Sequence, residues 1–512
     1  MTIDPEGFRR EGKTPICATC TTDRRARLRH AEPRCPSRYT KSRSDLLFRL
    51  GITADRGSRE DCRPPTGVRH GPAVPCGQRH SIPFHSSPSW TRDYFAALLV
   101  ALLLSGCANR NDTRERIELW GLGREGEVVA DMVPEFERQN PGIKVVVQQI
   151  PWTAAHEKLL TAYVGESVPD VAQMGNTWIP EMVAIGALED LTPLVGKSLG
   201  IDQRDYFAGI WATNVVNGSL YGIPWYVDTR VVFYRTDVLA SVGYKTPPRT
   251  WDEWMDAMAR IVQQRKARYA ILLPTNEWPP IVQLALTNGS TLLDAQGTHG
   301  AFEQPPFAEA FHLYLEMFRR RFAPVVSNTQ VANLYDQFAQ GDFAMYISGP
   351  WDVGEFRRRL PPAMNGKWLT MPLPARDAQH GPTGVSMAGG SSLVLFKASK
   401  HKEAAMKLIE YLSQPKQQIR FHELTGDLPA RRSAWHSPAL ANDPYFPAFR
   451  EQLERVAPLP QVPEWEEIAT TIYEHGEAAV RGKFTEAAAL ADLDRTTDRI
   501  LEKRRWVLAH RQ

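Results

Sequence analysis

The feature that most limits the fold of this chain is a regular alternation of short apolar runs with amphipathic stretches. Residues 116–120 and 143–150 have the pattern of strands, and the segment between them, 124–140, carries apolar residues at helical spacing on one face. Pro141 and Gly142 end that helix. A strand, a helix and a strand at this spacing predict a β-α-β unit, whose two strands lie parallel in one sheet.

The same alternation continues along most of the remaining sequence. It predicts strands at 170–174, 231–234, 269–273 and 391–396, and helices at 154–165, 180–185, 251–264, 307–318, 402–412 and 417–424. About 400 residues with this pattern are more than one hydrophobic core usually holds. We therefore predict an α/β protein with two lobes.

The first 106 residues differ in composition from the rest of the chain. They hold 18 Lys and Arg against 10 Asp and Glu, whereas the remainder holds 43 against 48, so the positive net charge arises in this leader and predicts no nucleic-acid partner. All six cysteines lie at or before Cys107, and Cys17-Ala-Thr-Cys20 has no second Cys-x-x-Cys, so we predict no metal site and no cofactor. We expect residues 1–90 to be a non-native or disordered leader.

A targeting signal follows the leader. Residues 94–104 form an apolar run of about eleven residues, too short for a bilayer span of about twenty but typical of a signal peptide. Leu104-Ser105-Gly106-Cys107 resembles the lipobox of bacterial lipoproteins, in which the cysteine is lipidated. A buried core helix is the alternative, which the polar residues 109–116 disfavour. We predict a lipoprotein signal peptide over 91–106, lipidation of Cys107, and a membrane-anchored location in the periplasm or cell envelope.

Gly121, Gly123 and Gly126 follow the first predicted strand with the G-x-G-x-x-G spacing of dinucleotide-binding loops. Those loops need an acidic residue about twenty positions later to bind the ribose hydroxyls, and residues 147–151 contain none, so we predict no dinucleotide site. The loop can instead serve a neutral, hydroxyl-rich ligand, since glycine permits close approach and a helix start offers free N–H groups. Glu125 either accepts hydrogen bonds from such a ligand or only favours the first helical turn, and both interpretations stay open.

Tryptophans gather in the part of the chain after Cys107, which holds 13 of the 14. Six lie where predicted strands end or loops begin, namely Trp120, Trp178, Trp225, Trp278, Trp351 and Trp465. Indoles stack on the apolar faces of pyranose sugars while polar neighbours, such as Asp228 and Arg230 after Trp225, pair with the hydroxyls. A single such Trp is a core residue more often than a ligand platform, but the repeated mixture favours a sugar site. Three more lie in helical patterns and are predicted to be structural: Trp251, Trp254 and Trp506.

Five stretches share their order and spacing with one known family. They are 168–178, with Val-Pro-Asp-Val and Gly-Asn-Thr-Trp; 220–235, with Tyr-Gly-Ile-Pro-Trp-Tyr-Val-Asp-Thr-Arg; 341–351, with Gly-Asp-Phe-Ala-Met-Tyr and Gly-Pro-Trp; Ala388-Gly389-Gly390; and 426–432, Gly-Asp-Leu-Pro-Ala-Arg-Arg. Over nearly all of 107–512 the chain thereby resembles the solute-binding lipoproteins of ABC importers, in the class that binds maltose and trehalose.

The resemblance implies a two-lobed periplasmic-binding-protein fold of type II, with three hinge crossovers and the ligand in the cleft between the lobes. It places the N-lobe at 107–224 and 386–458 and the C-lobe at 225–385 and 459–512. The crossovers are expected near 221–227, 382–388 and 457–463.

Carried over position by position, the resemblance nominates eleven ligand-binding residues and no catalytic ones. They are Glu125, Asn176, Thr177, Tyr226, Asp228, Arg230, Trp278, Trp351, Gly389, Gly390 and Arg432. Trp351 would stack on a sugar ring, Asp228 and Glu125 would accept hydrogen bonds from hydroxyls, and Arg432 would donate them. The two glycines would bring the backbone against the ligand. The maltose-binding member of the class has a His-Asp pair where this chain has Asn176-Thr177, so the resemblance does not imply carboxylate contacts there.

The implied function is binding rather than chemistry. The chain would be the solute-binding component of a sugar ABC transporter, not an enzyme, and would take an α-linked disaccharide such as trehalose or maltose, with a glycerol-linked or β-linked glycoside as second choice. Its partners would be the sugar, ABC permease subunits and, through Cys107, the membrane, with the protein itself a monomer. Two other classes stay open: an exported glycoside hydrolase using Glu125, Asp228 and Glu277 as paired carboxylates, and uptake of a charged solute, which needs a cleft of one sign of charge.

Overall fold

The computed structural model of this protein describes residues 112–196 and 200–510, which belong to one compact unit running from Gly106 to Gln512. The predicted leader, signal peptide and lipidation site at Cys107 lie outside these residues. Within the described part, every helix is too short or too polar to cross a membrane.

The first sheet begins with the predicted β-α-β unit. Strand β1 (Glu115–Leu122) is followed by α2 (Gly123–Gln139) and β2 (Ile143–Ile150), and β1 pairs in parallel with both β2 and β3 (Val171–Gly175). The residues that α2 buries include the predicted apolar face, Val128, Val129, Met132, Val133 and Phe136. The β-α-β prediction is therefore confirmed, with the strand and helix bounds within about two residues of those read from the sequence.

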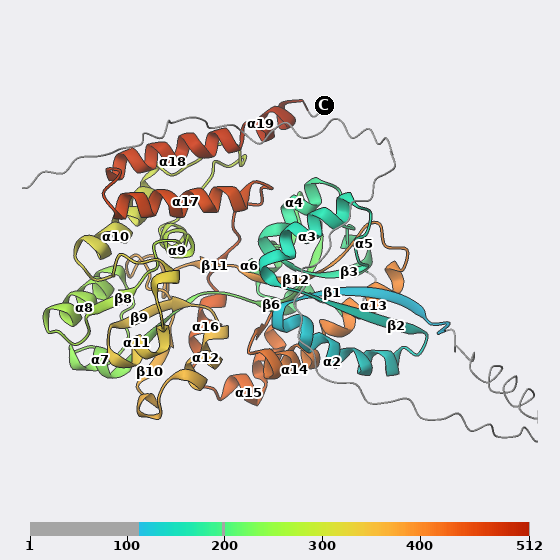
Figure 1. Cartoon of the computed structure of the whole chain (residues 1–512), viewed down its shortest axis with the longest axis horizontal. Helices are drawn as coiled ribbons and strands as arrows, with labels where there is room; N and C mark the ends of the chain where they lie inside the picture. The colour runs from blue at the N-terminus through green and yellow to red at the C-terminus, as the bar shows by residue number, and fades with distance from the viewer. Residues whose placement is uncertain (1–111, 197–199, 511–512) are drawn as a thin grey trace, which may run out of the picture. The chain divides into compact units, whose positions relative to one another are not determined.

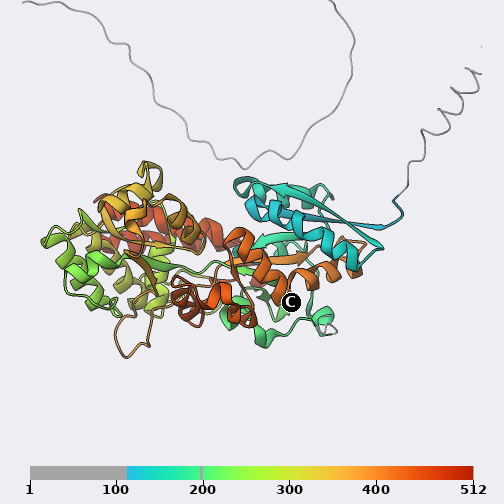
Figure 2. The ribbon, with the colours of Figure 1, turned by 90° about the horizontal axis from the view of Figure 1, so that it is seen from below.

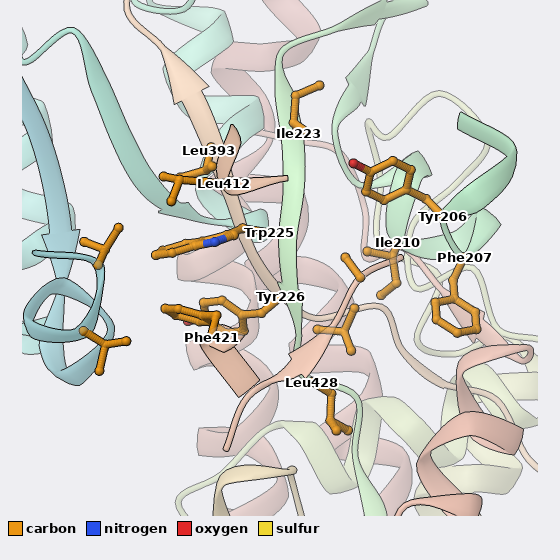
Figure 3. Close-up of a cluster of buried hydrophobic side chains, with 14 of the residues drawn as sticks. Tyr206, Phe207, Ile210, Ile223, Trp225, Tyr226, Leu393, Leu412, Phe421 and Leu428 are labelled. Atoms are coloured by element: carbon orange, nitrogen blue, oxygen red, sulfur yellow. The ribbon is translucent and has the colours of Figure 1, made fainter. Parts of the chain in front are cut away.

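This sheet has six strands and is mixed rather than wholly parallel. Its order is β13 (Leu428–Pro429), β6 (Gly222–Val227), β12 (Gly390–Leu395), β3, β1, β2, and β12 runs antiparallel to both β3 and β6. Beside β6 the Trp225 indole lies against Phe421, with ring centroids 4.3 Å apart, in the core drawn in Figure 3. Trp225 is 1% exposed, so it belongs to the core and is not a ligand platform.

The second sheet has four strands, in the order β10 (Trp368–Met371), β7 (Val231–Arg235), β9 (Phe343–Ser348), β8 (Tyr269–Leu272). Its helices include α8 (Trp251–Gln263), α9 (Pro279–Thr287), α10 (Pro305–Arg319), α17 (Trp465–Val480) and α18 (Glu486–Ile500). Figure 1 shows α17 and α18 side by side next to α9 and α10, and apolar residues of all four helices share one core. Figures 1 and 2 show the elements of the two sheets as two separate lobes.

The remaining elements are short or lie on the outside of the sheets. They are α3 (Trp152–Val164), η1 (Asn176–Trp178), α4 (Ile179–Ala184), α5 (Thr192–Val195), η2 (Gln203–Asp205), α6 (Ala208–Ala212), β4 (Val215–Val216), β5 (Ser219–Leu220), α7 (Thr236–Ser241), η3 (Asn328–Gln330), α11 (Leu334–Gln340), α12 (Trp351–Arg359), η4 (Pro362–Met364), α13 (Lys402–Leu412), α14 (Pro415–Thr425), η5 (Arg432–His436), α15 (Pro438–Ala441), α16 (Pro447–Leu453) and α19 (Glu502–Ala509). Among the helices read from the sequence, the bounds of 402–412 coincide with those of α13.

The chain passes between the two sheets more than once. It leaves the six-stranded sheet between β6 and β7 and returns between β10 and β12, by way of β11 (Ser386–Met387). Strand β11 pairs in parallel with β14 (Val456–Ala457), after which the chain enters α17. These passages lie beside the three predicted crossovers, while the exact lobe boundaries given above stay a prediction.

Candidate functional site

One cavity brings together residues from both lobes and from the passages between them. Its volume is about 540 Å³, within the range that holds small ligands. The residues that line it are Glu125, Trp152, Gly175, Asn176, Thr177, Trp178, Tyr226, Asp228, Arg230, Trp278, Trp351, Met387, Gly389, Gly390, Ser391, Asp427 and Glu466. Ten of the eleven predicted ligand-binding residues are in this set, so the structure gathers in one place side chains from Glu125 to Gly390 that are far apart in the sequence.

Arg432 is the exception, and its predicted place in the site needs correction. Its Nη2 donates to Glu454 Oε2 at 2.9 Å, and its guanidinium lies 4.6 Å from the centre of the Phe207 ring. These residues line a separate hollow of the lobe. The preceding Arg431 is 7% exposed and pairs with Asp205, so both arginines of this loop bind other parts of the same lobe in this structure, outside the cavity.

We expect Arg432→Met to bind ligand with the affinity of the wild-type protein, because its side chain lies outside the cavity. Loss of its half-exposed ion pair should lower the free energy of unfolding by less than about 1 kcal/mol. Isothermal titration calorimetry with the sugar that gives the largest thermal shift checks the first point. A more than tenfold loss of affinity would return Arg432 to the site.

Three of the six tryptophans proposed as platforms line the cavity: Trp178, Trp278 and Trp351. The other three, Trp120, Trp225 and Trp465, are at most 5% exposed and belong to hydrophobic cores. The sequence reading missed Trp152, the first residue of α3, which also lines the cavity and donates from Nε1 to Glu125 Oε2 at 3.2 Å. Trp152 follows the predicted strand 143–150, so the criterion that selected the other tryptophans, a position at the end of a strand, would also have selected it.

Trp351 combines a cavity position with an exposed ring, because it is 37% exposed. The ring folds over Gly349, where a Cβ atom would collide with three of the indole carbons. The Arg230 guanidinium lies 4.8 Å from the ring centre. The Gly-Pro-Trp sequence thus places the indole at the start of α12 (Trp351–Arg359), where Gly349 and Arg230 fix its position. Its exposed part can stack on a flat apolar surface of a ligand.

Tyr226 fixes the carboxylate of Glu125. The Tyr226 hydroxyl donates to Glu125 Oε1 and accepts from Gln173 Nε2 and Ser391 Oγ, all at 3.1 Å. Burial raises the pKa of Tyr226 well above its usual value, so the phenol stays neutral. With Trp152 on the other oxygen, Glu125 is held by two donors and retains lone pairs for a third. Of the two interpretations of Glu125, this geometry favours the hydrogen-bond acceptor.

Three residues that line the cavity each carry a buried polar atom without a hydrogen-bond partner. They are Asn176 Nδ2, Asp228 Oδ1 and Arg230 Nε, and the last two are 3.9 Å apart. Asn176 Oδ1 is already bonded by Ser392 Oγ at 3.0 Å, which leaves its amide nitrogen as the free donor. Buried polar atoms are normally paired. These two nitrogen donors and one oxygen acceptor are therefore groups with which the hydroxyls of a ligand can form hydrogen bonds.

The carboxyl groups of the cavity are not equivalent. Burial raises the pKa of Asp228 to about 6, with Arg230 opposing the shift. Burial raises the pKa of Asp427 to about 8, and the negative charge of Glu125 adds to this. At pH 7 Asp427 is therefore mostly protonated and can donate a hydrogen bond. The sequence reading missed Asp427, although it lies in the Gly-Asp-Leu-Pro stretch quoted above.

We expect Asp427→Asn to stabilise the fold more at high pH than at low pH. The folded-state pKa of Asp427 is raised, so its contribution to stability is fully present below the ordinary pKa and is lost progressively as the pH rises from there through about 8. The amide mimics the protonated carboxyl at every pH. The gain in melting temperature over the wild type should be larger at pH 8.5 than at pH 5, by at least about 2 °C.

Asp131→Asn, on an exposed position of α2, is the control and should show no pH-dependent gain. An equal difference between Asp427→Asn and wild type at both pH values would contradict a raised pKa.

The hydrolase alternative needs opposed carboxylates in one cavity. Glu277 is not among the lining residues and instead accepts from Asn328 Nδ2 at 3.5 Å, so only two of the three named carboxylates meet there. Within residues 112–196 and 200–510, no group of three or more His, Cys, Asp or Glu side chains is arranged to hold a metal ion.

Comparisons with known proteins place the chain in a family. The solved structure of the sugar-binding protein MalE from Xanthomonas citri is 49% identical, with a TM-score of 0.75, and the match covers 78% of this chain and all of that one. The diacetylchitobiose binding protein DasA of Streptomyces coelicolor is 28% identical over 59% of this chain and 70% of its own length. A maltose-bound MalE3 of T. maritima, 24% identical with a TM-score of 0.62 over 75% of this chain and 98% of that one, shares the fold.

The fold is thus the two-lobed, maltose-binding-protein-like periplasmic binding fold, as predicted. Residues 121–419, more than half of the chain, match the family described as bacterial extracellular solute-binding protein. The chain belongs to this family of bacterial extracellular solute-binding proteins.

Proposed function

We propose that this protein is the solute-binding component of a sugar ABC transporter and that it binds an α-linked disaccharide, trehalose or maltose, in the cavity between its lobes. The observation that carries the proposal is the combination of exposed indoles with unpaired buried polar atoms in one cavity. The similar proteins from Xanthomonas citri and Streptomyces coelicolor are described as binding sugars, which supports the same ligand class here.

A disaccharide suits the chemistry of the walls. The Trp178 and Trp351 rings come from different lobes, on η1 and α12, so each can stack on the apolar face of a different pyranose ring. Asp228, Arg230 and Asn176 then pair with hydroxyls, and protonated Asp427 adds a donor. The mixture of acceptors and donors suits a neutral ligand better than a solute of one charge.

Binding favours closure of the lobes, because only the closed arrangement lets both walls touch the ligand. The closed form then delivers the sugar intact to the permease subunits. A lipid on Cys107 holds the monomeric protein at the membrane, where the permease is found. In this role the protein performs no chemistry on the sugar.

The test is a thermal-shift panel of trehalose, maltose, cellobiose, glycerol glycosides, glucose and charged amino acids. A ligand that binds only the folded form adds about 2.7 kcal/mol to the free energy of unfolding at a concentration 100 times the Kd, and the melting temperature rises as a result. We expect the largest shift with trehalose or maltose. A panel in which no sugar shifts the melting temperature would overturn the proposal, and release of glucose during the incubation would favour the hydrolase.

A further inference from the structure

His156 supports the aromatic wall of the cavity from behind. It lies on α3, half-buried, with Nε2 2.6 Å from Glu181 Oε2 on α4. Its ring lies against the Trp178 indole, with centroids 5.1 Å apart and planes inclined by 37°. Neither His156 nor Glu181 is among the residues that line the cavity, whereas Trp178 is. His156 therefore acts on a ligand only through its neighbours.

The contacts of Trp178 extend along the wall. Trp178 meets Trp152 edge to face, with ring centroids 5.8 Å apart, and Trp152 donates to Glu125 at 3.2 Å. A rotation of the Trp178 ring would thus disturb a second indole and the carboxylate that it holds. The order His156, Trp178, Trp152 and Glu125 is a continuous path of contacts from α3 into the site.

Three acidic groups act on the charge of His156. Glu181 faces it from α4, Glu157 from its own helix, and Glu466 from α17, which belongs to the other lobe. Glu466 also lines the cavity, and its helix α17 contacts η1, the segment that carries Trp178. The hydrogen bond to Glu181 raises the pKa of His156 above its ordinary value, partial burial opposes this, and Glu466 and Glu157 raise it further.

We propose that His156 is a positioning residue of the sugar site. As an imidazolium it holds Trp178 through its pairing with Glu181 and attracts Glu466 of the other lobe, so that the ligand is bound more tightly when His156 is charged. This inference rests on the proposed function. Glu466 lies on α17, in the lobe that does not contain His156, so this attraction acts between the lobes and favours the closed, ligand-bound form. Affinity therefore rises as the pH falls through the pKa of His156.

The experiment measures the Kd for trehalose and maltose by calorimetry from pH 5.5 to 8.5, in the wild type, His156→Gln and His401→Gln. Wild-type binding at pH 7.5 is the first result, and its absence would defeat the proposed function rather than the role of His156. The glutamine amide can still donate to Glu181 but carries no charge. His401, paired with Glu115 at 2.9 Å outside the cavity, provides the matched control.

We expect the ratio of the Kd of His156→Gln to that of the wild type to be about 5 at pH 5.5, as for a partly exposed ion pair, and to fall towards 1 at pH 8.5. Asp228 and Asp427 also titrate in this range, but they do so in every variant and cancel in the ratio. His401→Gln should give a ratio near 1 throughout.

Glu466→Gln is the second variant, on the other lobe. If the attraction between His156 and Glu466 operates, the pH dependence of the ratio is smaller when both proteins carry Glu466→Gln. A ratio of the two Kd values that stays constant with pH would overturn the proposal, whether it is near 1 or well above it. A constant ratio would mean that the effect of His156 on binding does not depend on whether its imidazole is charged.

Discussion

Trp351→Ala is expected to weaken sugar binding by about 100-fold and to abolish most of the ligand-induced rise in melting temperature. Trp351 is the cavity indole that Gly349 and Arg230 hold in place while 37% of it stays exposed. Truncating such an aromatic anchor typically costs about 2 to 4 kcal/mol of binding energy. A loss of about 2.7 kcal/mol corresponds to the 100-fold change. Calorimetry with the sugar that gives the largest thermal shift measures it.

The control for this variant is Trp506→Ala on α19, which removes an indole that is 62% exposed and lies outside the cavity. Its affinity should equal that of the wild type. The melting temperature of Trp351→Ala without ligand should change little, since a partly exposed ring buries limited apolar area. A Trp351→Ala protein that binds sugar within threefold of the wild type would remove Trp351 from the site.

The backbone of the site could be predicted from the sequence because it follows from patterns within short windows. The β-α-β unit from β1 to β2 is specified by apolar periodicity and by the Pro141-Gly142 break, and both survive in the structure. Strands β6 and β12 bring Tyr226 and Gly390 together, and β3 leads directly to Asn176. The order of strands across the sheet, with β12 antiparallel between β3 and β6, depends on pairing over about 200 residues and left no local signal.

Side-chain roles were harder to predict than positions, because they depend on burial. Trp225 and Trp278 both follow loop-like sequence, yet the first packs on Phe421 in the core and the second lines the cavity. Asp427 is separated from Glu125 by about 300 residues, and its raised pKa arises from burial beside that charge. Periodicity reports which face of an element is apolar, but it does not report which of two neighbouring side chains reaches a cavity made by other segments.

The adjacent arginines of the loop at 431–432 show the same limit and lead to the second large effect, on stability. Arg431 is 7% exposed; its Nε donates to Asp205 Oδ2 at 2.7 Å and its Nη1 to the carbonyls of Gly200 and Ser413 at 2.9 and 3.1 Å. Its guanidinium also lies 5.3 Å from the centre of the Tyr206 ring. The side chain thus joins segments that are more than 200 residues apart.

We expect Arg431→Met to lower the free energy of unfolding by about 3 kcal/mol, because it removes the donor of the buried Ser413 carbonyl and leaves the Asp205 carboxylate without its cation. The two Ser433 donors that also bind Asp205, at 2.8 and 2.6 Å, keep the loss at the lower end of the range for buried ion pairs. Arg432→Met makes the same chemical change one residue later, at a half-exposed ion pair, and should cost less than about 1 kcal/mol. Thermal and urea unfolding of the two variants compares them directly. Equal losses of stability in the two variants would contradict this prediction. They would mean that the buried contacts of Arg431 contribute no more to the free energy of unfolding than the half-exposed ion pair of Arg432.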